Sequence, residues 1–148
     1  MTDLNIRMVF WQPQLVLPPL TTNDIHVWCA SISQISSQYA LWQQLLSIAE
    51  QERASRMLLP ATRTQFVVGR GLLREILAGY LSTSPTALHF DYGARGKPRL
   101  LNGNDLHFNL SHSADLLVVA IRRGDEVGID VEKIRPVDEK KLAQQFLT

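Results

Sequence analysis

Asp130 and Glu132 stand two positions apart in the otherwise apolar segment 127–132. Side chains alternate across a β-strand, so a strand here places both carboxylates on one face and turns Ile129 and Val131 toward the core. Two hard oxygen ligands beside open water positions suit Mg²⁺ that is shared with a phosphorylated substrate. The pair therefore predicts metal-dependent phosphate chemistry, and an ordinary solvated strand face is the alternative.

A polar cluster lies upstream of these carboxylates. The segment 107–113 reads HFNLSHS, precedes an apolar run at 116–121 and follows the turn-like sequence YGARGKP at 92–98. Inside a strand, its His, Asn and Ser side chains leave buried donors and acceptors unpaired unless they meet a ligand or one another. Ser111 and His112 do not form a hydrolase pair, because adjacent strand residues point to opposite faces. The cluster is therefore a candidate binding site.

Three motifs in this order resemble those of the 4'-phosphopantetheinyl transferases of the surfactin-synthetase-activating class: GKP at 96–98, FNLSHS at 108–113 and GIDVEK at 128–133. The resemblance implies an enzyme that moves the 4'-phosphopantetheine arm of coenzyme A onto a serine of an acyl or peptidyl carrier protein. It also implies an α+β fold built as two similar lobes in one chain. In each lobe, helices are expected to pack on one face of an antiparallel sheet.

The same resemblance implies roles for individual residues. Asp130 and Glu132 are expected to hold Mg²⁺ at the coenzyme A diphosphate and to act as the catalytic carboxylates. Lys97, Ser111 and His112 are expected to bind coenzyme A, with Lys97 and His112 on its phosphates. The carrier serine attacks one phosphorus, and the 3',5'-bisphosphate portion of coenzyme A leaves. The family's candidate for the base that takes the serine proton lies in a later segment.

That later segment is where the sequence departs from the family. A Trp-x-x-Lys-Glu signature on a helix of the second lobe has no counterpart after Glu132, and residues 137–148 read as the opening of a helix without a stop signal. We therefore expect an irregular Pro-containing leader at 1–23, a first lobe at 24–125 and a truncated second lobe at 126–148. The alternative to an active enzyme is an inactive fragment that binds coenzyme A weakly, exposes apolar surface and self-associates.

Basic residues gather in the middle of the chain. Residues 53–99 hold eight Lys and Arg against two acidic residues, although the whole chain has a net charge of +1. The block lacks the interleaved aromatics on which single-strand binders stack bases, so it favours a small polyanion such as coenzyme A over nucleic acid. Arg63 and Arg70 fall on one predicted helix and Arg53 falls near a basic position of the family, whereas another such position falls on Glu50. The three arginines are candidate phosphate contacts, with a solvated arginine face as the alternative.

Hydrophobic periodicity predicts the elements that carry these residues. In chain order they are a strand near 24–32, a helix at about 38–58 that is broken near Ser47, a helix from Pro60 to about Leu81, and strands at 88–92, 106–111, 116–123 and 127–134. The alternation of Ile25, Val27 and Cys29 predicts a buried strand face with a core thiol.

The composition excludes several classes of protein. The single cysteine rules out an internal disulfide and a cysteine zinc cluster, which favours a reducing compartment. No apolar run is long enough for a membrane span or a signal peptide. We expect a cytoplasmic enzyme without a membrane or nucleic-acid partner. The sequence leaves open whether its carrier serves fatty acid, polyketide or nonribosomal peptide synthesis.

Overall fold

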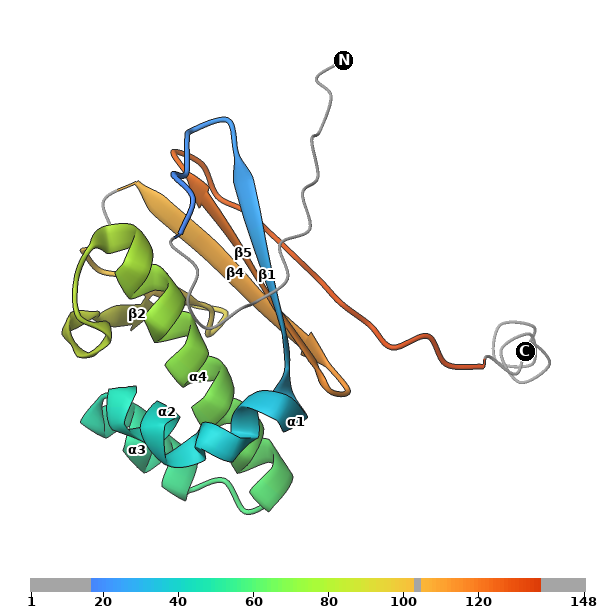
Figure 1. Cartoon of the computed structure of the whole chain (residues 1–148). Coiled ribbons are helices and arrows are strands. Elements are labelled where there is room, and N and C mark those ends of the chain that lie inside the picture. Colours follow the sequence, from blue (N-terminus) through green and yellow to red (C-terminus); the bar gives the residue numbers. More distant parts are fainter. Residues whose placement is uncertain (1–16, 103–104, 137–148) are drawn as a thin grey trace.

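A computed structural model describes residues 17–102 and 105–136 of the chain (Figure 1). Its elements are β1 (Ile25–Ser31), α1 (Ile32–Ile35), the 3-10 turn η1 (Ser36–Gln38), α2 (Tyr39–Leu45), α3 (Ile48–Ser55), α4 (Pro60–Leu81), the 3-10 turn η2 (Pro85–Ala87), β2 (Phe90–Tyr92), β3 (Pro98–Leu100), β4 (Leu106–Ser113) and β5 (Leu116–Arg123). The long helix α4 lies across one face of the sheet, and the shorter helices gather beside it (Figure 1). The predicted α+β class is confirmed. The first sixteen residues of the predicted leader at 1–23 lie outside the described residues, as does the predicted helix at 137–148.

The main sheet is antiparallel and has the strand order β1-β5-β4, so β4 is one of its edges. Its register aligns Trp28, Val119 and Leu110 across the three strands on the face that meets α4. β2 and β3 form a separate antiparallel hairpin. The sequence did not predict β3, because this strand is only three residues long and directly follows a glycine-rich turn.

Local signals set the helix ends. Ser47 Oγ accepts a hydrogen bond from the N–H of Glu50, and the Glu50 carboxylate accepts one from the N–H of Ser47, which makes a capping box at the start of α3. Pro60 lies in the first turn of α4, where its missing N–H costs nothing. The predicted break near Ser47 and the predicted helix from Pro60 to Leu81 are confirmed. Within the described ranges, no helix combines the length and apolar character that crossing a membrane requires.

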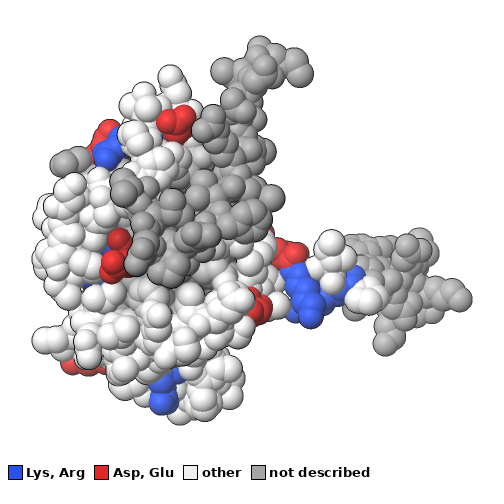
Figure 2. Space-filling model, viewed as in Figure 1, with Lys and Arg blue, Asp and Glu red and all other residues white. Residues whose placement is uncertain are grey.

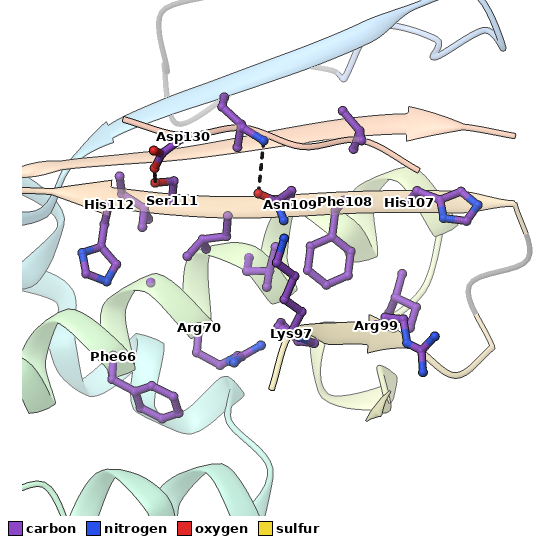
Figure 3. A pocket seen from close by; sticks show the side chains of 18 of the residues that line it. Phe66, Arg70, Lys97, Arg99, His107, Phe108, Asn109, Ser111, His112 and Asp130 are labelled. Atoms are coloured by element: carbon purple, nitrogen blue, oxygen red, sulfur yellow. Dashed lines mark hydrogen bonds between the residues drawn. The ribbon is translucent and has the colours of Figure 1, made fainter. Parts of the chain in front are cut away.

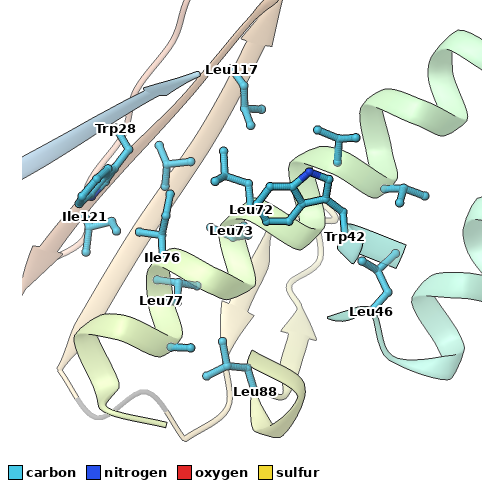
Figure 4. Close-up of a cluster of buried hydrophobic side chains, with 14 of the residues drawn as sticks. Trp28, Trp42, Leu46, Leu72, Leu73, Ile76, Leu77, Leu88, Leu117 and Ile121 are labelled. Atoms are coloured by element: carbon cyan, nitrogen blue, oxygen red, sulfur yellow. The ribbon is translucent and has the colours of Figure 1, made fainter. Parts of the chain in front are cut away.

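The hydrophobic core lies between α4 and the sheet (Figure 4). Leu73 and Leu77 of α4 are at most 1% exposed, and so are Leu117 and Ile121 on β5. Burying each such side chain contributes about 1.5–3 kcal/mol. This interface fixes α4 against β5 and its neighbour β4, and so fixes the distance between the residues that these two elements present to a ligand.

The buried face of β1 is the opposite of the predicted one. Ile25 and Val27 are 45% and 39% exposed, and Cys29 is exposed too, so the predicted core thiol is wrong. Trp28 is buried instead, because its Nε1 donates to Tyr80 Oη at 3.0 Å and thus finds the partner that a buried indole needs. Both faces of β1 carry apolar residues, so alternation alone does not decide which face is buried.

His26 belongs to the same network and therefore has a structural role. Its Nδ1 lies 2.6 Å from Tyr80 Oη. Burial lowers the pKa of His26 from 6.5 and raises the pKa of Tyr80 to about 12. Both groups are therefore neutral at physiological pH, and the contact ties β1 to the last turns of α4.

Gly71 marks the closest approach of α2 and α4. A Cβ at this position lies 2.7 Å from the Cβ and 2.9 Å from the Cα of Trp42, so the helices must separate to admit it. We predict that Gly71→Ala lowers the free energy of unfolding, measured by urea denaturation, by about 1–3 kcal/mol. Gly69→Ala is the control, because a Cβ there meets only the Leu117 side chain at 3.5 Å. Equal losses in the two variants contradict the close packing at Gly71.

Candidate functional site

A cleft of about 830 Å³ surrounds the free edge of β4 (Figure 3). Phe66 and Arg70 of α4 form one wall, and the β2–β3 hairpin contributes Lys97. β4 contributes side chains from both of its faces, and the segment that follows β5 adds Asp130. Segments that are far apart in the sequence therefore meet at one place.

Most of the predicted site residues line this cleft: Arg70, Lys97, Ser111, His112 and Asp130. The cleft lining does not include Arg53, Arg63 or Glu132. Arg53 lies 5.2 Å from the ring centroid of Phe66, and Arg63 donates through Nη2 to Met57 O at 2.7 Å. Sequence reasoning missed Gln65, which lines the cleft beside Phe66 and has no motif to mark it.

The segment that carries the carboxylates runs along β4 without joining the sheet. Its backbone N–H groups donate to alternate side chains of β4: Ile129 to Asn109 at 3.1 Å, Val131 to Ser111 at 3.2 Å and Lys133 to Ser113 at 2.9 Å. Because donors and acceptors both advance by two residues in the same direction, the segment runs parallel to β4 in one register. The predicted strand at 127–134 is wrong, since side chains and not backbone carbonyls take up these N–H groups.

Asp130 is oriented by Ser111. Ser111 Oγ donates to Asp130 Oδ1 at 2.9 Å, so the only hydroxyl proton of Ser111 is directed at the carboxylate (Figure 3). Asp130 and Glu132 are exposed while Ile129 and Val131 are half-buried, so the predicted alternation is confirmed. In the described part of the chain no cluster of three or more metal-ligating side chains is found. This pair of carboxylates fits a hard cation such as Mg²⁺ that keeps most of its water ligands.

Arg70 forms a buried cationic wall of the cleft. Its guanidinium lies 5.6 Å from the ring centroid of Phe66 and 5.3 Å from that of Phe90, and its Nε is 3.4 Å from Glu50 Oε1. The side chain is 10% exposed, and this burial lowers the pKa of Arg70, although an arginine remains protonated. Arg70 Nη1 has no hydrogen-bond partner among residues 17–102 and 105–136. A buried unpaired donor is unfavourable, and the positive charge of Arg70 at the cleft wall suits an anionic ligand.

The β2–β3 hairpin positions Lys97. Its turn is closed by hydrogen bonds from Gly96 N to Gly93 O at 2.8 Å and from Gly93 N to Lys97 O at 3.2 Å. Gly96 has a φ of +72°, in the left-handed region that favours glycine. The Lys97 side chain extends from the hairpin toward β4 (Figure 3) and is in no ion pair with the described residues.

Two basic residues of 53–99, Arg74 and Arg56, are engaged within the chain. Arg74 is 2% exposed, and Arg56 pairs with Glu52 at 3.6 Å on the surface. On the face shown in Figure 2, Lys and Arg atoms form small separate areas among uncharged ones. Neither Arg74 nor Arg56 is therefore a free cation for a ligand.

Comparisons with known proteins show which family this chain is similar to. Residues 30–123 match the family described as 4'-phosphopantetheinyl transferase, N-terminal. The chain is 39% identical over 140 residues to the 4'-phosphopantetheinyl transferase HetI of Nostoc sp., covering 92% of this chain and 59% of HetI. It is 36% identical over 93 residues to the 4'-phosphopantetheinyl transferase psf-1 of Bacillus pumilus, covering 63% and 38%. The chain thus spans less than two thirds of the length of these relatives.

The fold matches two solved structures. One is a holo-(acyl-carrier-protein) synthase from Bacillus anthracis in complex with coenzyme A, with a TM-score of 0.54, 22% identity, and coverage of 66% of this chain and 91% of that one. The other is the Helicobacter pylori holo-[acyl-carrier-protein] synthase in complex with coenzyme A, with a TM-score of 0.50, 15% identity, and coverage of 68% and 100%. Because the family match extends from β1 through β5, over more than half of the residues, the chain belongs to the 4'-phosphopantetheinyl transferase family.

Proposed function

We propose that this protein transfers the 4'-phosphopantetheine group of coenzyme A to a serine of an acyl or peptidyl carrier protein. The observation that carries the proposal is the meeting of Arg70 and Lys97 with Asp130 around one cleft. A diphosphate ligand needs cationic side chains on its oxygens, and a carboxylate beside it suits a bridging cation. Membership of the family supports this class of reaction.

In this proposal the cationic residues bind the coenzyme A phosphates. Lys97 and Arg70 approach from the hairpin and from α4, and both side chains line the cleft. Arg53 lies over the rings of Phe66 and Tyr92, at 5.2 and 5.8 Å from their centroids, and is proposed to extend this surface beyond the cleft. Arg63 is bound to the backbone before α4, so its proposed contribution is to hold that loop.

The two carboxylates are proposed to act at the coenzyme A diphosphate by holding a cation. Asp130 and Glu132 are the residues that would hold Mg²⁺, which when bound neutralises the charge that develops on the departing 3',5'-bisphosphate. Ser111 keeps Asp130 in place by donating to Oδ1, and its hydrogen bond from Val131 N fixes the segment itself. Ser111 therefore acts on the ligand through Asp130.

Binding of coenzyme A without transfer is the second candidate function. The observation that favours it is the donor set: the described residues bring together no third metal-ligating side chain. An assay of group transfer separates the two candidates. A labelled phosphopantetheine arm on coenzyme A is offered with a panel of acyl and peptidyl carrier proteins, with Mg²⁺ and with excess EDTA.

We expect label on at least one carrier in the Mg²⁺ arm, and none with EDTA, when the natural protein is used in its full length. Coenzyme A binding with no label on any carrier refutes the transfer proposal and supports the second candidate.

Lys97→Ala is predicted to weaken coenzyme A binding by about tenfold or more, because a hydrogen bond to a charged group contributes about 1.5–3 kcal/mol. Isothermal titration calorimetry at two salt concentrations measures this loss, and the salt dependence should decrease in the variant. Arg95→Ala is the matched control, since Arg95 lies in the same turn, is exposed and does not line the cleft. Equal losses in both variants contradict a specific Lys97 contact. Equal affinity of the unsubstituted protein for coenzyme A and its 3'-dephospho form contradicts recognition of the 3'-phosphate.

A further inference from the structure

His112 is held from α4 by a residue that no motif marks. It lies on the face of β4 that meets α4, and its ring points toward that helix (Figure 3). The ring Nδ1 lies 2.9 Å from Gln65 Nε2. An amide N–H group only donates, so Nδ1 accepts and the neutral ring carries its proton on Nε2.

The ring has a second nitrogen with no partner in the described part of the chain. The Gln65 contact is the only hydrogen bond of the His112 side chain with these residues, and both side chains line the cleft. A histidine whose Nδ1 is occupied has one tautomer and a restricted ring rotation, as in metal sites where a partner orients the ligating imidazole. The Nε2–H group is then a fixed donor for a ligand.

We propose that Gln65 is a positioning residue that sets the tautomer and rotation of His112, so that Nε2–H donates to an anionic phosphate oxygen in the cleft. The inference rests on the proposed function for the identity of that anion as a coenzyme A phosphate. Gln65 itself touches no ligand in this arrangement. Without it, the ring samples both tautomers and other rotations, and we expect coenzyme A to bind about three- to tenfold more weakly.

Two substitutions separate the hydrogen bond from the shape of the side chain. Gln65→Met keeps the length and removes the donor, whereas Gln65→Glu replaces the donor by an acceptor. The ring ¹⁵N chemical shifts of His112 report the tautomer in the full chain without ligand, at an alkaline pH where imidazoles are neutral. We expect the Nε2–H form in the unsubstituted protein, a mixture in Gln65→Met and the Nδ1–H form in Gln65→Glu.

Calorimetry with coenzyme A then tests the consequence for binding. Gln65→Met should weaken binding in the unsubstituted background and have no further effect in a His112→Ala background, because the two residues act as one unit. A purely structural role of Gln65 gives the same loss in both backgrounds and overturns the inference. An Nδ1–H tautomer in the unsubstituted protein, which places the amide oxygen at the ring, overturns it too. If the unsubstituted protein binds no coenzyme A, the proposed function fails, and the tautomer measurement alone decides whether Gln65 sets the state of His112.

Discussion

Asp130→Ala is expected to lower Mg²⁺-dependent transfer by at least about a hundredfold while the protein stays folded. The substitution removes one of the two proposed cation ligands, and a bound metal contributes several kcal/mol of charge stabilisation in the transition state. Stability changes little, because Asp130 is exposed and, among the described residues, hydrogen-bonds only with Ser111 and its own neighbour Val131. Label transfer to the carrier measures the activity of the full-length variant, and urea denaturation measures its stability.

Asp125→Ala is the matched control for this prediction. The substitution removes the same charge from the same part of the chain. Asp125, however, is 71% exposed, pairs with Arg122 at 3.0 Å and does not line the cleft. Its variant should keep nearly full activity. Undiminished Mg²⁺-dependent transfer by Asp130→Ala contradicts the assignment of the carboxylate pair.

Arg74→Ala is expected to lower the free energy of unfolding by about 3–5 kcal/mol, the usual result of removing one partner of a buried ion pair. Arg74 is 2% exposed, and its Nε and Nη2 each lie 2.8 Å from Glu50 Oε2. Its Nη1 donates to the carbonyl oxygens of Pro85 and Leu88. The substitution leaves the Glu50 carboxylate, 4% exposed, with a weaker partner and two carbonyls without their donor. Urea denaturation measures the loss.

A surface ion pair is the control for the buried one. Arg56 pairs with Glu52 at 3.6 Å in an i,i+4 arrangement, with side chains 78% and 61% exposed. Arg56→Ala should therefore change stability by no more than about 0.5 kcal/mol. A comparably small loss in Arg74→Ala is the outcome that contradicts a structural role for the buried pair.

Sequence periodicity predicts α4 and β5 well for physical reasons. Pro60 fixes the start of α4, and the apolar residues Phe66, Leu73, Leu77 and Tyr80 recur along it at spacings of seven, four and three residues. β5 is the central strand of its sheet, so it is apolar on both faces and reads as a strand without alternation. The break at Ser47 is equally visible, because its capping partner Glu50 stands three residues later.

The carboxylate segment shows what sequence patterns do not convey. Ile129, Asp130, Val131 and Glu132 alternate as a strand does, and their exposure follows that alternation. A segment joins a sheet only when its backbone N–H groups donate to backbone carbonyls of the neighbouring strand. Here the side chains of alternate β4 residues accept these hydrogen bonds instead, which no local propensity encodes.

The arginines show the same limit for the site. Charge and helical spacing mark Arg63 and Arg70 equally, yet one binds a backbone carbonyl and the other lines the cleft. Arg70 also meets Glu50, at a position where the family resemblance implies a basic residue. The buried carboxylate of Glu50 pairs with Arg74 and lies 3.4 Å from Arg70, so an acidic residue stands behind the cationic wall of the cleft.

The backbone amide NMR shifts that coenzyme A causes in this chain test the proposed site most directly. Titration into ¹⁵N-labelled protein should shift the amides of Lys97, Ser111 and His112 most, with a saturable dependence on concentration, and leave Val27 and Cys29 on the outer face of β1 unchanged. Saturable binding that shifts the outer face of β1 and leaves residues 97 and 111–112 unmoved contradicts a coenzyme A site at the edge of β4.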